Sequence, residues 1–309
     1  MRSRAGIALL AGALLVALLT SCTPPSPSPT GSTATPSARK DRAGMVSVSS
    51  SRDMYLTCRG SGSPIVVLIS GTGGAADEWT TLPPLSSPSS TAAPAEAVLP
   101  ALSADSRVCA YDRPGTTRED GAPSPTPPVP QPTTALDGAR DLRALLDASG
   151  ERGPVVLVGA SWGGMIAQLY ARTYPRQVAG LVLVDSASTW LAQTLSPDQW
   201  RGWMAVIAAA PGDSAAERPA YDPTLQEFAA AAAAPELPAA VLSSDRPWDL
   251  GVTPDASTWP AWLAAQDDLA RAWNATHVSA THSGHGIQVE QPALVASAIR
   301  GVLARAREK

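Results

Sequence analysis

The sequence predicts an α/β fold in which a mostly parallel sheet is covered on both faces by helices. Continuous apolar runs such as residues 64–70 (PIVVLIS) and 179–187 (AGLVLVDSA) are typical of strands that are buried on both faces. These runs alternate along the chain with stretches that have helical spacing, which favours a parallel sheet between two helical layers. The chain has 309 residues, 44% of them hydrophobic, and can therefore bury one large core.

The N-terminal residues 1–22 predict an export signal. Two arginines precede an apolar run over residues 7–19, which as a helix would cover roughly 20 Å and is too short for a bilayer core of about 30 Å. The run ends in LTSC at Cys22, which resembles the lipobox of bacterial lipoproteins, where the cysteine is lipidated. We expect an extracytoplasmic protein that is lipid-anchored to the bacterial cell membrane through Cys22. An ordinary secretory signal that is cleaved nearby is the alternative.

A tether is predicted between this anchor and the domain. Residues 23–43 are rich in Pro, Ser and Thr and have no periodic apolar positions. Such a segment cannot bury enough apolar surface to offset the entropy lost on ordering. We expect residues 23–43 to be a disordered, extended tether and residues 44–309 to be a single domain.

Composition and spacing disfavour three other kinds of site. The net charge is −4, from 23 basic and 27 acidic residues, without a basic cluster beyond the N-terminus, so no nucleic-acid partner is expected. The three histidines are not accompanied by cysteine or acidic ligands at zinc-like spacing, so no metal site is expected. The GTGG run at residues 71–74 lacks the spacing of a dinucleotide-binding loop.

The predicted elements of the domain follow from their periodicity. Residues 45–50 and 53–60 alternate and predict short strands, and residues 106–112 (SRVCAYD) predict a buried strand. Leucines at helical spacing predict a helix over residues 135–150, which ends at a glycine. Further strands are predicted at 155–161, 239–245 and 275–281, and further helices at 165–175 and 293–309.

A helical lid is predicted over residues 188–238, where the strand and helix alternation breaks. The segment is rich in alanine, has high helix propensity and is too long for a loop in a compact domain. It also contains Trp190, Trp200, Trp203 and Phe228. These aromatic residues either shape an apolar pocket for an acyl group or pack the lid onto the core, and the sequence leaves both interpretations open.

The run GASWGG at residues 159–164 joins a predicted strand directly to a predicted helix. A strand, a sharp turn and a helix are the setting of a nucleophile elbow, in which Ser161 would be held in a strained conformation. Gly159 and Gly163 provide room where β-carbons would clash. The helix N-terminus behind Ser161 favours developing negative charge. The run therefore predicts Ser161 as a nucleophile.

This run resembles the nucleophile elbow of the α/β-hydrolase fold, and three other motifs resemble that family in the same order. Residues 70–79 (SGTGGAADEW) are similar to its oxyanion loop, and residues 108–115 (VCAYDRPG) to the loop after its fourth strand. Residues 283–292 (SGHGIQVEQP) are similar to the loop that carries the catalytic histidine. The resemblance runs from about Met45 to the last helix and implies an α/β-hydrolase fold and a serine hydrolase.

A serine hydroxyl needs a base to take its proton, and a carboxylate must hold that imidazole in the right tautomer. The resemblance implies that His285 is the base. His277 lies within a predicted strand and is expected to be structural, whereas His282 is expected to be a polar loop residue.

The resemblance leaves three candidates for the acid. Asp185 ends the predicted sixth strand, a location that the family also uses. Asp245 and Asp249 follow the predicted seventh strand, the commoner location, but without the usual Gly-x-x-Asp form. Asp185 is favoured, and its alternative role is to cap nearby backbone amides.

The oxyanion hole needs two backbone N–H groups that point at the developing charge. The resemblance implies that these belong to Trp162, directly after the nucleophile, and to Thr72. Many family members have His-Gly before the second donor, where this chain has Ser-Gly, and Gly73 is the alternative donor.

The family's sheet order also bears on the three cysteines. If Cys22 carries lipid, Cys58 and Cys109 remain as a pair in an oxidising compartment. Strands two and four are neighbours in the family, so the resemblance implies a disulfide between these two residues. Two buried free thiols are the alternative.

Together, these motifs predict an exported serine hydrolase that cleaves a small-molecule ester or amide through an acyl-enzyme on Ser161. Its expected partners are this substrate and the membrane, and no cofactor is needed. The alternatives are a non-catalytic surface-binding lipoprotein, an aminopeptidase or a cofactor-free peroxidase. A serine at the elbow, in place of aspartate, disfavours dehalogenase and epoxide hydrolase chemistry.

Overall fold

The computed structural model describes most of the expected domain. The predicted signal peptide, with Cys22, and most of the predicted tether lie outside the described residues. Among the described residues, no helix is long and apolar enough to cross a membrane. The described residues are 40–82, 96–209, 215–253 and 256–308.

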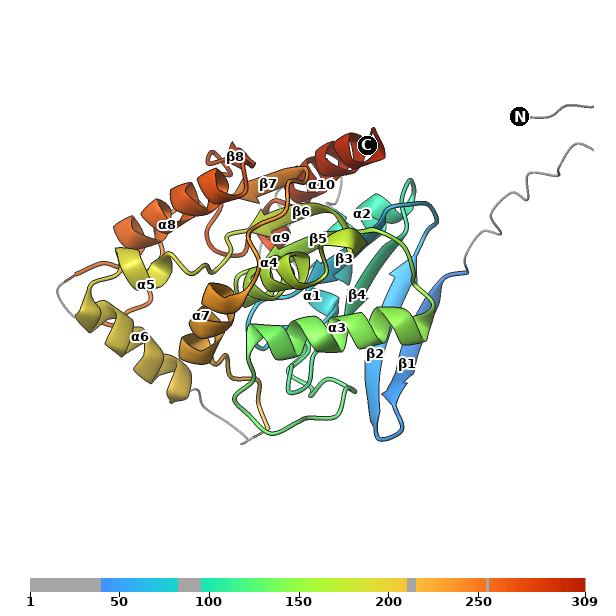
Figure 1. Ribbon diagram of the computed structural model, residues 1–309, viewed down its shortest axis with the longest axis horizontal. Helices are drawn as coiled ribbons and strands as arrows, with labels where there is room; N and C mark the ends of the chain where they lie inside the picture. The colour runs from blue at the N-terminus through green and yellow to red at the C-terminus, as the bar shows by residue number, and fades with distance from the viewer. Residues whose placement is uncertain (1–39, 83–95, 210–214, 254–255, 309) are drawn as a thin grey trace, which may run out of the picture. The chain divides into compact units, whose positions relative to one another are not determined.

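An eight-stranded sheet forms the centre of the domain, in the order β1-β2-β4-β3-β5-β6-β7-β8 (Figure 1). Strand β2 is antiparallel to both of its neighbours, β1 and β4, and all other neighbours are parallel. The mostly parallel sheet predicted from the sequence is therefore confirmed. The strands are β1 (Arg42–Ser49), β2 (Arg52–Arg59), β3 (Ile65–Ile69), β4 (Val108–Tyr111), β5 (Val155–Ala160), β6 (Val178–Val184), β7 (Ala239–Leu242) and β8 (Thr276–Val278).

The sheet begins slightly earlier than the sequence predicts. Arg42 and Ala43, which were expected to end the tether, pair with Cys58 and Thr57 of β2. Both residues continue the register of the β1–β2 ladder, so they belong to the domain despite their polar and small side chains.

Helices cover both faces of the sheet. On one face α3, α4 and α8 share a buried cluster with alternate residues of the strands, and on the other face α1, α2, α9 and α10 share a second cluster. The two helical layers predicted from the alternating pattern are thus present. The helices on the first face are α3 (Ala135–Ser149), α4 (Trp162–Thr173) and α8 (Trp259–Ala272). Those on the second face are α1 (Asp77–Thr80), α2 (Val98–Ser103), α9 (Ile287–Glu290) and α10 (Pro292–Arg307), and a short 3₁₀ helix covers Pro175–Gln177.

Helix α3 shows how the sequence sets the ends of an element. Thr134 caps its N-terminus in a capping box with Asp137, which satisfies two backbone N–H groups. Gly150 ends the helix with φ 73°, a left-handed conformation that favours glycine. The helix covers the residues predicted from its leucine spacing.

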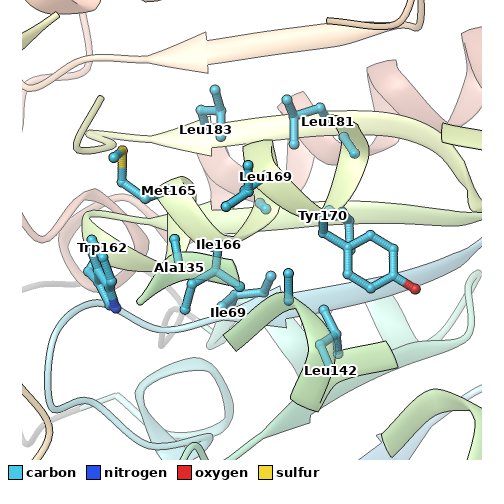
Figure 2. Close-up of a cluster of buried hydrophobic side chains, with 14 of the residues drawn as sticks. Ile69, Ala135, Leu142, Trp162, Met165, Ile166, Leu169, Tyr170, Leu181 and Leu183 are labelled. Carbon is cyan, nitrogen blue, oxygen red and sulfur yellow. The ribbon is translucent and has the colours of Figure 1, made fainter. Parts of the chain in front are cut away.

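Helix α4 packs against both the sheet and α3. Figure 2 shows Met165, Ile166 and Leu169 of α4 among side chains of the neighbouring elements. All three are buried, and each such side chain contributes about 1.5–3 kcal/mol by burial. A Cβ on Gly138 of α3 would lie 2.8 Å from Ile166 Cδ1, so glycine allows the close approach of the two helices. This packing fixes the helix that follows Ser161.

Several helices differ from the sequence predictions: the short helices α1, α2 and α9 are not predicted, and neither is the longer α8. Helix α4 begins at Trp162 instead of residue 165, because Gly163 and Gly164 are helical despite their low helix propensity. Their β-carbons would lie within 2.4 Å of the Ile69 carbonyl and 1.8 Å of Ser186 Oγ, so close packing requires glycine there. Helix α8, between β7 and β8, is not predicted from the sequence pattern.

The predicted lid segment, between β6 and β7, is helical. Its helices contribute buried aromatic side chains to the cluster on the α4 face. The lid helices are α5 (Leu191–Thr194), α6 (Pro197–Ala208) and α7 (Tyr221–Ala230).

A disulfide joins Cys58 and Cys109, with an S–S distance of 2.09 Å. The two residues lie opposite each other in the register of β2 and β4, the adjacent strands that the family's sheet order implies. Together with Glu151 they form the one cluster of possible metal ligands among the described residues. The disulfide uses both sulfur atoms, so the two cysteines of this cluster link β2 covalently to β4.

Replacing both cysteines by alanine is expected to lower the free energy of unfolding by about 2–4 kcal/mol. The link spans 51 residues of sequence, and its loss frees that loop in the unfolded chain. Urea unfolding of the double variant and the oxidised wild type measures the difference. Equal stabilities, or two free thiols at Cys58 and Cys109 in an intact-mass measurement of unreduced protein, would contradict this prediction.

Candidate active site

Three residues expected in a catalytic triad lie at the carboxyl edge of the sheet. Ser161 follows β5, Asp185 follows β6 and His285 lies in the loop after β8. Strands β5 to β8 are parallel, so their carboxyl ends are at the same edge. This edge brings together Asp185 and His285, which are 100 residues apart in the sequence. Open α/β sheets commonly form their sites at this edge.

Ser161 sits in a sharp turn. Its backbone has φ 48° and ψ −120°, a strained conformation for a non-glycine residue that costs of order 1–3 kcal/mol. The neighbouring glycines are required sterically, because a Cβ on Gly159 would lie 2.5 Å from the Gly163 carbonyl oxygen. The Ser161 N–H donates to Val184 O at 3.1 Å, and its carbonyl accepts from Ala187 N–H at 3.0 Å. The turn is therefore fixed against the end of β6, on both sides of Asp185.

Asp185 is fully buried, and four donors surround its carboxylate. Its Oδ1 accepts from Ser244 N–H at 2.9 Å and from Trp262 Nε1–H at 3.1 Å. Its Oδ2 accepts from Ser244 Oγ–H at 2.9 Å and lies 2.7 Å from His285 Nδ1. Buried charges require such hydrogen bonding, and the arrangement holds His285 with its Nε2 directed away from the carboxylate.

Neither of the other two candidate acids contacts His285. Asp245 accepts from Ser283 N–H at 3.0 Å, and backbone N–H groups, that of His282 first, hold the pKa of this half-buried carboxyl below its ordinary value. Asp249 caps the turn before α8, and hydrogen bonds, that of the Ser257 hydroxyl first, likewise hold its pKa low. The geometry therefore associates Asp185 alone of the three with the imidazole.

Two tryptophans pack against the imidazole of His285. The Trp248 ring lies 4.4 Å from the imidazole, centroid to centroid, and the Trp262 ring meets it edge-on at 5.5 Å. Trp248 Nε1–H donates to Ser244 Oγ at 3.1 Å, so one hydroxyl links the tryptophan to Asp185. The side chain of His285 is still 37% exposed and can reach a substrate.

The sequence did not single out Ser244, Trp248 and Trp262. Ser244 is the second residue after β7, in the loop where the family commonly carries its acid, and that location is a usable signal. Trp248 lies in the loop after it and Trp262 lies in α8, which the sequence pattern does not predict. The hydrogen bonds of Ser244 and Trp262 to Asp185 span 59 and 77 residues of the sequence.

The Ser161 hydroxyl has no side-chain hydrogen bond to any residue that the structure describes. Catalytic hydrogen bonds are often long or poorly aligned until substrate binds. Ser161 is half-buried at the site, and its hydroxyl forms no hydrogen bond with the described residues.

The predicted oxyanion loop adjoins the nucleophile. A Cβ on Gly71 would lie 3.3 Å from Ser161 Cβ, so glycine allows the loop to approach this closely. Trp162 occupies the first position of α4, where no helical carbonyl is available to its N–H. The N–H of Gly73, the alternative donor, instead donates to Glu217 Oε2 at 2.7 Å. Thr72, between Gly71 and Gly73, remains the candidate for the second donor.

A second set of Ser, His and Asp lies at the edge of the sheet. Ser243 Oγ is 2.6 Å from His277 Nε2, and His277 Nδ1 is 3.4 Å from Asp267 Oδ1. Ser243 is only 1% exposed, and its N–H donates to Val278 O in continuation of the β7–β8 ladder. The set therefore ties β8 to β7 and α8, in keeping with a structural role for His277. His282 is an exposed loop residue 3.6 Å from Asp245.

Aromatic rings connect Trp162, the residue after Ser161, to His285. Trp162 contacts Tyr221 at 4.9 Å, and Tyr221 contacts Trp203 at 4.8 Å, both distances between ring centroids. Trp203 in turn lies 6.5 Å from Trp262, which meets His285. Tyr221 and Trp203 belong to the lid and are buried, so these lid aromatics pack onto the site itself.

Comparison with known proteins agrees with this architecture. Residues 64–276 match the family described as alpha/beta hydrolase fold. The chain is 48% identical over 60 residues to Lipase LipV of Mycobacterium tuberculosis, covering 19% of this chain and 23% of the lipase. It is 38% identical over 88 residues to the poly(3-hydroxyalkanoate) depolymerase of Ectopseudomonas oleovorans, covering 28% of each protein. The matched curated relatives are covered over 16% to 41% of their own length.

Among solved structures, a thermophilic esterase from Thermogutta terrifontis superposes with a TM-score of 0.57 at 20% identity. The match covers 86% of this chain and 99% of the esterase, and at this identity it shows a shared fold. The family match covers more than half of the chain, and the sheet order and the strained serine turn are consistent with it. The chain therefore belongs to the alpha/beta hydrolase fold family.

Proposed function

We propose that this protein is a serine hydrolase that cleaves a carboxylic ester, or an amide, through an acyl-enzyme on Ser161. One observation carries the proposal. The buried Asp185 carboxylate holds His285 Nδ1 at 2.7 Å, and the backbone on either side of Asp185 bonds Ser161, which has φ 48° at the N-terminus of α4. Such a constellation is recognised by its geometry and not by sequence position.

The mechanism assigns each group one task. His285 Nε2 takes the Ser161 hydroxyl proton as Oγ attacks the substrate carbonyl carbon, and Asp185 stabilises the imidazolium through Nδ1–H. The N–H groups of Trp162 and Thr72 bind the oxyanion. The tetrahedral intermediate expels the alcohol or amine, which takes the proton from His285. Water, deprotonated by the same imidazole, then releases the acid and restores Ser161.

An ester is the favoured substrate over a peptide with a free N-terminus. Names among the relatives include a lipase and a polyester depolymerase, and proline iminopeptidases also match at 30% identity over 115 residues. An aminopeptidase needs an unpaired negative charge for the substrate ammonium. Beside the oxyanion loop, Glu217 pairs with Arg113 at 2.6 Å, while burial raises the pKa of Glu78, which accepts a hydrogen bond from Gln288.

We also propose that the enzyme acts outside the cytoplasm, on a lipid anchor. The LTSC sequence that ends at Cys22 and the Pro-rich residues after it support this proposal. The Cys58–Cys109 disulfide adds to it, because such links persist mainly in oxidising compartments.

A fluorophosphonate probe is expected to label the full-length protein at Ser161 only, because the hydroxyl there is activated by His285. Ser161→Ala should abolish both labelling and ester hydrolysis with little change in the melting temperature. Ser243→Ala is the matched control, since it removes a serine that also contacts a histidine, and it should label like the wild type. Labelling that survives in Ser161→Ala would refute the assignment.

Asp185→Asn is expected to lower kcat by about 10³- to 10⁴-fold, because the amide no longer fixes the imidazole tautomer. Steady-state kinetics on a chromogenic ester measures the loss. Asp249→Asn, which alters the turn before α8 and does not touch His285, should keep kcat within about threefold of the wild type. If the Asp249 variant loses activity and the Asp185 variant keeps it, the acid that orients His285 is Asp249, in the loop after β7.

Cys22→Ser is expected to abolish incorporation of an alkyne-tagged fatty acid in a bacterial host and to move the protein out of the membrane fraction. Two acyl chains are sufficient for stable anchoring, whereas the described domain offers no spanning helix. Fractionation and click labelling of the two forms measure the change. A wild-type protein without the lipid tag would leave the ordinary secretory signal as the explanation.

A further inference from the structure

We propose that Glu217 of the lid and Arg113, in the loop after β4, form a clamp that positions the oxyanion loop. The clamp would hold the Thr72 N–H in its productive orientation. The inference rests on the proposed function and deepens it, because it makes the geometry of the oxyanion hole depend on a lid residue. Glu217 and Arg113 act here as positioning residues.

The two side chains form a bidentate, buried ion pair. Arg113 Nε donates to Glu217 Oε1 at 2.6 Å, and Nη2 donates to Glu217 Oε2 at 2.8 Å. Their side chains are each 3% exposed. Removing one partner of such a buried ion pair lowers the stability of the fold, because the charge of the other partner then stays buried without an opposite charge.

The same pair binds the oxyanion loop on both sides of Thr72. Arg113 Nη1 donates to the Ser70 carbonyl at 3.0 Å, and Nη2 donates to the Gly71 carbonyl at 2.6 Å. Glu217 Oε2 accepts from Gly73 N–H at 2.7 Å. Three backbone groups around Thr72 are therefore fixed by two side chains. Because the Thr72 N–H belongs to the peptide that joins Gly71 to Thr72, its direction follows from these bonds.

Glu217 reaches this position through the backbone of the lid. Its N–H donates to the Gly115 carbonyl at 2.9 Å, and Ala220 N–H donates to Thr133 O at 2.9 Å. Gly115 has φ 81°, and a Cβ there would lie 2.4 Å from the Ala215 carbonyl oxygen, so the two chains touch closely. These bonds fix the position of the lid segment relative to the loop that carries Arg113.

The ion pair also meets an electrostatic requirement of the site. An unpaired carboxylate beside the loop would oppose a developing oxyanion, and an unpaired guanidinium would leave a buried charge without compensation. Pairing cancels both charges while leaving the remaining donors of Arg113 for the Ser70 and Gly71 carbonyls. The clamp thus orients the loop without placing a net charge next to it.

A second buried pair in the chain supplies a matched control. Arg107 donates to Glu151 through Nη2 at 2.5 Å and Nε at 3.4 Å, and the two side chains are 2% and 4% exposed. Arg107 directly precedes β4, whereas Arg113 follows it, so this pair lies at the opposite end of the strand from the oxyanion loop. Glu151→Gln therefore changes the same chemistry away from the site.

The test compares Glu217→Gln with Glu151→Gln in the full-length protein. Melting temperature, steady-state kcat and KM on a p-nitrophenyl ester, and the second-order rate of fluorophosphonate labelling are measured for each. Both variants should lose similar amounts of thermal stability. Only Glu217→Gln should lower kcat and the labelling rate, each by about 10- to 100-fold, with KM within about threefold, because an oxyanion donor acts in the transition state.

Two results would overturn the clamp. One is a Glu217→Gln variant with wild-type kcat and labelling rate, and the other is an equal loss of activity in Glu151→Gln, which would make the effect one of stability. If Glu217→Gln does not fold, Glu217→Asp takes its place. It keeps the charge beside Arg113 but shortens the reach to Gly73, and it should lower kcat with a smaller loss of melting temperature.

The outcome for the wild type separates this inference from the proposed function. A wild-type protein that is neither labelled at Ser161 nor active on any ester would overturn the proposed function, and the catalytic role of the clamp with it. A wild type that is labelled at Ser161, together with a Glu217→Gln variant that is labelled equally fast, would overturn the clamp alone.

Discussion

The burial of the Asp185 carboxylate is the constraint on which the rest of the site depends. A fully buried carboxylate must be hydrogen-bonded, and here the donors come from the loop after β7, from α8 and from the loop after β8. Three segments far apart in sequence therefore converge at the tip of β6. The same convergence sets the position of His285, and the backbone bonds on either side of Asp185 set the position of Ser161. The hydrogen bonds that join these segments of the fold are therefore the same bonds that position the residues of the site.

The sequence predicts the parts of this network that are local and leaves out those that are not. Gly159 signals the strained turn, because its steric requirement against the Gly163 backbone lies within five residues, whereas Gly163 makes room for the distant Ile69 and Ser70 carbonyls. Buried apolar runs signal the strands. Ser244 and Trp262 carry no local signal for their hydrogen bonds to Asp185, since that carboxylate lies more than fifty residues away. Helix α8 is missed because alanines and a glutamine share its buried face with Trp262 and Leu269, which weakens its apolar pattern.

The two Ser, His and Asp sets of the chain show what distinguishes a nucleophile from a structural serine. Ser243 Oγ lies within hydrogen-bond distance of His277 Nε2, yet Ser243 continues a regular strand ladder and is buried. Ser161 instead has a positive φ that lifts its side chain out of the β5 strand and onto the N-terminus of α4. Backbone geometry and access, and not the three side chains alone, decide which set can perform chemistry.

The lid contacts both the oxyanion loop and the surroundings of His285, by different kinds of interaction. On the oxyanion side it supplies Glu217, whose bonds to Arg113 and Gly73 are polar and directional. On the side of the base it supplies Trp203 and Tyr221, whose ring contacts lead to Trp262 and so to the imidazole. Hydrogen bonds weaken steeply when their geometry is disturbed, whereas apolar contacts between tilted and edge-on rings are less directional. Under the proposed function, substitutions among the lid aromatics can therefore change the packing beside His285 while the Glu217 bonds keep the oxyanion loop in place.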